Sequence, residues 1–77
     1  MNNADEIEQA KFVLLSLIGK LYVLSKQSIG EKQKEYGEKI KQLQKELKLI
    51  DKSVILAKTR DVYIPYMQHL KEEEGLK

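Results

Sequence analysis

The chain contains no cysteine, and it has only one histidine, one proline and four glycines among its 77 residues. Without cysteine, neither disulfides nor thiolate metal sites can form, and His69 alone cannot build an imidazole cluster. A chain of this length buries only about 60% of the surface that its unfolded form exposes. We therefore expect its stability to come from close helix packing or from assembly with other chains.

Long apolar runs are also missing. The longest, from Phe12 to Leu24, is 13 residues long and is interrupted by Lys20, whereas a membrane-spanning helix needs about 20 apolar residues. The first residues are acidic, unlike the basic start of a signal peptide. The sequence therefore predicts a soluble, cytoplasmic protein without a membrane partner.

The residues that are abundant favour helices. Apolar residues make up 42% and charged residues 34% of the chain, and the most frequent types, apart from Ile, are strong helix formers. Apolar residues recur at alternating spacings of three and four from Ile7 to Leu24, which predicts a helix over about 4–28. A second series in a new register runs from Ile29 to Ala57 and predicts a helix over about 32–63. The phase shift between them predicts a turn at about 29–31, so the fold class is all-α with an antiparallel helical hairpin.

The hairpin leaves apolar residues on other faces, and two architectures could cover them. In the first, the second helix is continuous and two chains form a dimeric four-helix bundle. In the second, this helix breaks near 51–53 and folds back, which gives a monomeric three-helix bundle. The sequence slightly favours the dimer, because the apolar series crosses 51–53 without a phase change. Pro65 predicts an end of the second helix and the start of a short C-terminal helix over about 65–73.

No arrangement of residues indicates catalysis. There is no Gly-rich phosphate loop and no metal-ligand spacing, and the acidic residues of the second helix, Glu46 among them, fall off its apolar series and are expected to face water. We therefore expect a protein that is not an enzyme and that has no cofactor, no metal site and no small-molecule substrate.

Two apolar groups are candidate protein interfaces. The first surrounds Gly19 on the first helix and could be covered by a third helix of the same chain, by a second copy or by a different protein; its members are Phe12, Leu15, Gly19, Tyr22 and Val23. The second group either caps the end of the bundle or binds a partner, since Tyr and Met are enriched at interfaces. Its members are Tyr63, Tyr66 and Met67.

A row of lysines on the second helix suggests an alternative function. Lysines at this spacing could follow a phosphate backbone without reading sequence, although lysine is also the commonest residue that keeps a helix face soluble. The row consists of Lys34, Lys41, Lys45, Lys48 and Lys52. The sequence predicts a small helical protein–protein interaction module (an adaptor, inhibitor or assembly protein), acting as a homodimer or with a protein partner; the alternative is non-sequence-specific binding of nucleic acid.

Overall fold

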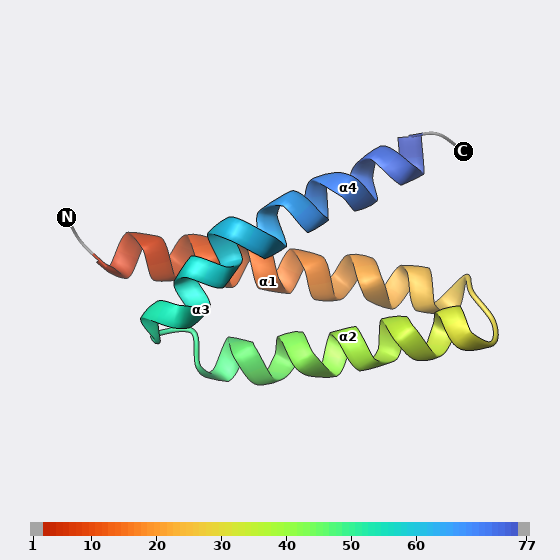
Figure 1. Cartoon of the computed structure of the whole chain (residues 1–77), viewed down its shortest axis with the longest axis horizontal. Coiled ribbons are helices and arrows are strands. Elements are labelled where there is room, and N and C mark those ends of the chain that lie inside the picture. The colour runs from red at the N-terminus through yellow and green to blue at the C-terminus, as the bar shows by residue number, and fades with distance from the viewer. Residues whose placement is uncertain (1–2, 76–77) are drawn as a thin grey trace.

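The computed structural model describes the backbone of residues 3–75 and the side chains of residues 4–72. Within this part of the chain every regular element is helical, which confirms the predicted all-α class. Two long helices form an antiparallel hairpin, and a third helical segment with one wide π-helical turn folds back across them (Figure 1). The elements are α1 (Asn3–Lys26), α2 (Glu31–Lys48), α3 (Ser53–Lys58), the π-helical turn (Thr59–Tyr63) and α4 (Ile64–Gly75).

The turn between α1 and α2 lies close to its predicted position. It depends on Gly30, whose φ of 71° and ψ of −138° are accessible almost only to glycine. The side-chain amide of Gln33 donates a hydrogen bond of 3.1 Å to the carbonyl of Ser25 across the turn. The first turn of α2 is thereby tied to the end of α1.

The second helix is not continuous: of the two courses predicted for residues 32–63, the unbroken helix is not formed, and the chain breaks close to 51–53. α2 ends at Lys48, residues 49–52 form a turn, and the chain reverses into α3. Lys52 is the N-cap of α3, and no side chain caps the first turn of that helix. The continuous helix that the four-helix dimer requires is therefore not formed, and the described residues have the three-helix arrangement.

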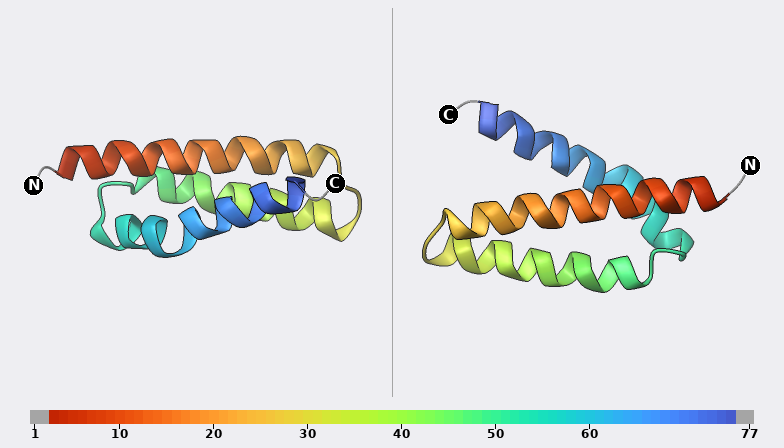
Figure 2. Two further views of the ribbon diagram at one scale, coloured as in Figure 1. Left: turned by 90° about the horizontal axis from the view of Figure 1, so that it is seen from above. Right: turned by 180° about the vertical axis from the view of Figure 1, so that it is seen from behind.

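Pro65 lies inside the third segment and does not end it. A proline has no N–H, and its ring would collide with the carbonyl four residues earlier in a regular α-helix. The wide turn lies directly before Pro65, where the N–H of Ile64 bonds to the carbonyl of Thr59. Widening the helix at this point lets it continue into α4. Figure 2 shows the third segment passing alongside the hairpin as one bent helix.

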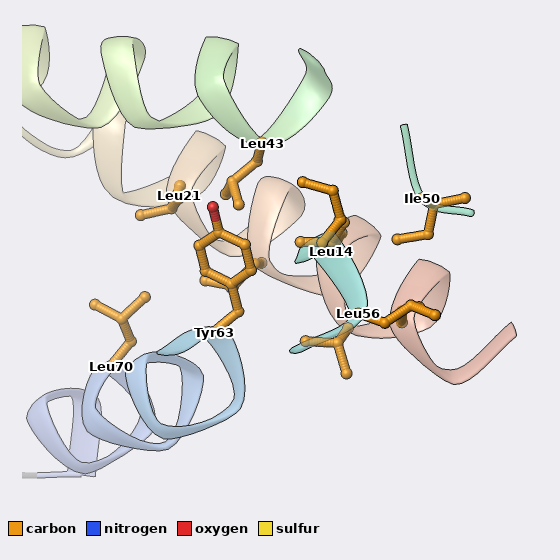
Figure 3. Close-up of a cluster of buried hydrophobic side chains, with 11 residues drawn as sticks. Leu14, Leu21, Leu43, Ile50, Leu56, Tyr63 and Leu70 are labelled. Carbon is orange, nitrogen blue, oxygen red and sulfur yellow. The ribbon is translucent and has the colours of Figure 1, made fainter. Parts of the chain in front are cut away.

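The core lies where the three segments meet. Leu14, Leu17 and Leu21 on α1 and Leu43 on α2 are completely buried. The third segment and the turn before it add further apolar side chains to this cluster (Figure 3), namely Ile50, Ile55, Leu56, Tyr63 and Leu70. Burying each of these leucines contributes about 1.5–3 kcal/mol, so this cluster is a main source of the stability of the fold.

Candidate interaction surfaces

The outward face of α1, defined by Phe12, Leu15, Gly19, Tyr22 and Val23, is not covered by the rest of the described chain. Its four apolar side chains are exposed by 69% for Phe12, 56% for Leu15, 55% for Tyr22 and 50% for Val23. A Cβ atom built on Gly19 would have no neighbour within 4 Å, so the space above this glycine is open. α2 and the third segment together cover the opposite side of α1, where Leu14 and Leu17 are buried.

Charged residues stand at both ends of the outward face. Glu8 lies one turn before Phe12, and its carboxylate is 3.8 Å from the ammonium group of Lys11. Lys26 lies one turn after Tyr22, with its Nζ atom 4.9 Å from the centre of the Tyr22 ring. Both contacts are on the surface, where they contribute little to stability. The apolar surface thus has a glutamate, paired with Lys11, at one end and a lysine at the other.

The second predicted interface is part of the core. Tyr63 is only 3% exposed, and Tyr66 and Met67 are partly buried against the core cluster. Because the third segment folds back over the hairpin, the side chains of this group pack against the core. Of the two readings of this segment, the structure favours the internal one.

A buried glutamate was missed by the sequence analysis. Glu46 on α2 is 5% exposed, so the expectation that it faces water is wrong. Its carboxylate accepts hydrogen bonds from the Tyr63 hydroxyl, from Lys58 Nζ at 2.6 Å and from Gln42 Nε2 at 2.9 Å. The Lys58 ammonium also lies 5.5 Å from the centre of the Tyr63 ring. This polar cluster joins α2 to the third segment.

The spacing of α2 contains a signal for Glu46. Leu43, Glu46, Leu47 and Ile50 are spaced so that they share one side of a helix. Glu46 lies at the edge of this side. A residue at the edge is exposed to solvent when one helix packs against α2, and it is buried when two helices do. Its burial therefore follows from the break after Lys48.

The predicted lysine row is exposed along its whole length. Lys34, Lys41, Lys45 and Lys48 lie on α2, whereas Lys52 lies in the turn before α3 rather than on the same helix. Among residues whose side chains are described, none of these five lysines has a carboxylate within 4.0 Å.

A polar groove of about 510 Å³ separates α2 from α4. Tyr36 and Lys39 line it on one side, and Tyr66 and His69 on the other. The Nζ atom of Lys39 lies 5.2 Å from the centre of the Tyr66 ring and bridges the groove. His69 itself is exposed.

Neither the family models nor the curated proteins or solved structures compared with this chain give a match. Within residues 3–75, no helix has the length and apolar character needed to cross a membrane.

Proposed function

We propose that this protein is a small helical protein–protein interaction module, an adaptor, inhibitor or assembly protein, that binds another protein chain through the outward face of α1. The observation that carries this proposal is the exposure of Phe12, Leu15, Tyr22 and Val23, each by half or more, on one face of a single helix. A helix that is apolar on two sides normally has both sides covered. The described part of the chain covers only one of them.

Covering the outward face releases a large amount of free energy for a chain of this size, because it removes apolar surface from water. Removing apolar surface from water yields about 25 cal/mol per Å², and aromatic side chains offer the largest areas. Phe12 and Tyr22 are both more than half exposed, and aromatic residues near the centre of an interface often dominate its affinity. The open space at Gly19 lets a partner helix approach the backbone closely.

Photo-crosslinking in the cells that naturally make this chain tests the proposal. A photoreactive phenylalanine replaces Leu15 on the outward face in one variant and Gln44, an exposed residue of α2, in the control. We expect a protein adduct from position 15 and none from position 44, with the partner identified by mass spectrometry. No adduct from position 15, or equal adducts from both, would contradict the proposal.

The exposed lysine row supports a second candidate function, non-sequence-specific binding of nucleic acid. Five exposed lysines, none of them within 4.0 Å of a described carboxylate, offer sites for phosphate groups. In this case retention on duplex DNA or RNA falls steeply with salt, and each Lys→Ala change weakens it by a similar amount. Absence of retention at about 50 mM salt, where such contacts are strong, would exclude this function.

A further inference from the structure

We propose that the chain that covers the outward face of α1 is a second copy of this protein, and that the two α1 helices pair antiparallel. This inference rests on the proposed function, because it takes the outward face to be an interaction surface. It adds the identity of the partner and the register of the pairing.

The outward side of α1 carries its own coiled-coil spacing. Six residues follow one another at intervals of four, three, four, three and four, as the core positions of a heptad do. All six are on the side of α1 opposite the buried leucines, and we call them the outward seam. They are Glu8, Phe12, Leu15, Gly19, Tyr22 and Lys26.

The outward seam is complementary to itself when reversed. Its members form three pairs that lie at equal distances on either side of the level of Leu17: Glu8 with Lys26, Phe12 with Tyr22, and Leu15 with Gly19. Two antiparallel copies crossing at this level bring each residue opposite its pair mate in the other chain. Because the dimer is two-fold symmetric, every such contact is made twice.

Each of the three contacts is favourable. Leu15 enters the open space above Gly19 of the partner, Phe12 meets an aromatic ring, and the Glu8 carboxylate meets the ammonium group of Lys26. In a parallel pairing, Glu8 would lie opposite Glu8 and Lys26 opposite Lys26, so that like charges meet. Gly19 would lie opposite Gly19, and the space between the two glycines would stay unfilled. Nothing requires a helix of a different protein to match this self-complementary order, so charge and shape favour a second copy.

The interface is small. The seam spans eighteen residue steps, or about 27 Å at 1.5 Å per residue, and one helix is about 10 Å wide. Such a strip is smaller than a standard specific interface and falls in the range of weak contacts, so we expect a dissociation constant of about 10–100 µM. The chain is then a dimer or a monomer according to its concentration.

Charge reversal followed by mixing tests both the partner and the register. In Glu8→Lys, both end contacts become Lys on Lys, and in Lys26→Glu both become Glu on Glu. By sedimentation equilibrium at low salt, we expect each variant alone to dimerise about tenfold or more weakly than the unmodified chain. Mixed together, the two variants should form a heterodimer, because each end contact again joins a lysine to a glutamate.

Two variants on α2 are matched controls. Glu35→Lys removes a surface ion pair to Lys32 at 4.0 Å, like the pair between Glu8 and Lys11. Lys32→Glu removes a lysine from above the Tyr36 ring, at 5.9 Å, as Lys26→Glu does at Tyr22. We expect both controls to dimerise like the unmodified chain.

The outcomes separate this inference from the proposed function. A chain that stays monomeric up to about 500 µM, well above the expected dissociation constant, overturns the second-copy proposal. A crosslink from position 15 to another protein then leaves the proposed function standing. If the chain is monomeric and position 15 gives no crosslink to any protein, both the second-copy proposal and the proposed function are overturned. A dimer that is insensitive to the charge reversals overturns the outward seam as its interface.

Discussion

The inward and outward faces of α1 differ in composition as well as in exposure. The inward face consists of small and aliphatic residues, Ala10, Leu14, Leu17 and Leu21, and is almost completely buried. The outward face has two aromatic residues around a glycine, with an acid at one end and a base at the other. Aliphatic residues fill a permanent core, whereas aromatic residues bordered by charges are typical of surfaces that bind a partner. One side of α1 therefore holds the fold, and the other side is the exposed apolar surface for which we propose binding.

The largest predicted effect contrasts a leucine from each face. Leu17→Ala should destabilise the fold by about 2–5 kcal/mol, because it leaves a cavity among fully buried side chains, enough to unfold much of a chain this small. Leu15→Ala should change stability by no more than about 0.5 kcal/mol. Urea unfolding at about 1 µM, where the dimer is dissociated, measures both. Equal losses would show that the two faces do not differ in this way.

A smaller effect concerns the contact that holds the third segment over the inward face. Glu46→Gln should destabilise the fold by about 1–3 kcal/mol, because the amide loses the ion pair to the partly buried Lys58 and places an N–H₂ group among donors. Glu38→Gln, at an exposed position of α2, is the control and should leave stability within about 0.5 kcal/mol. Both are measured by urea unfolding, and the dimer constant should stay unchanged. Equal stability of the two variants would refute a supporting role for the Glu46 cluster.

The smallest effect concerns the glycine of the outward face. Gly19→Ala should stabilise the monomer by up to about 1 kcal/mol, since alanine favours the helix and its Cβ meets no neighbour. The same change should weaken the dimer, because it partly fills the space that Leu15 of the second copy enters. Gly37→Ala on α2, where a Cβ also meets nothing within 4 Å, provides the control. Gly37→Ala should stabilise the monomer by the same amount. It should not change the dissociation constant of the dimer, measured by sedimentation equilibrium.

Local patterns predicted the class of the fold and the position of its first turn. The spacing of Ile7 to Leu24 and the glycine at position 30 are signals within a few residues of the elements that they specify. The break after Lys48 was predicted only as the less favoured alternative, because the apolar series crosses 51–53 without a phase change and helix propensity is a weak guide against tertiary packing. The contact between Glu46 and Tyr63 joins residues 17 apart, and no short pattern reveals it.

The candidate surfaces also divide into those that local spacing predicts and those that depend on the tertiary fold. The exposure of Phe12, Leu15, Tyr22 and Val23 agrees with a surplus that helix spacing predicted from the sequence. The burial of Tyr63 agrees with only one of the two readings of its group, the structural one. Local spacing could not decide between these readings, because the position of Tyr63 depends on the direction that the chain takes after residue 52. Residues on the first helix could be placed from their own spacing, whereas those after the break required the fold.

The most direct test of a binding surface on the outward face of α1 is a dilution series followed by NMR. Spectra of the unmodified chain are compared from about 500 µM down to about 5 µM, a range that brackets the expected dissociation constant. We predict that the shifts which change with concentration are concentrated at Glu8, Phe12, Leu15, Gly19, Tyr22 and Lys26, while those of Leu14, Leu17 and Leu21 stay nearly constant. Shifts that do not change on dilution, or changes concentrated on α2 or α4, would contradict this account.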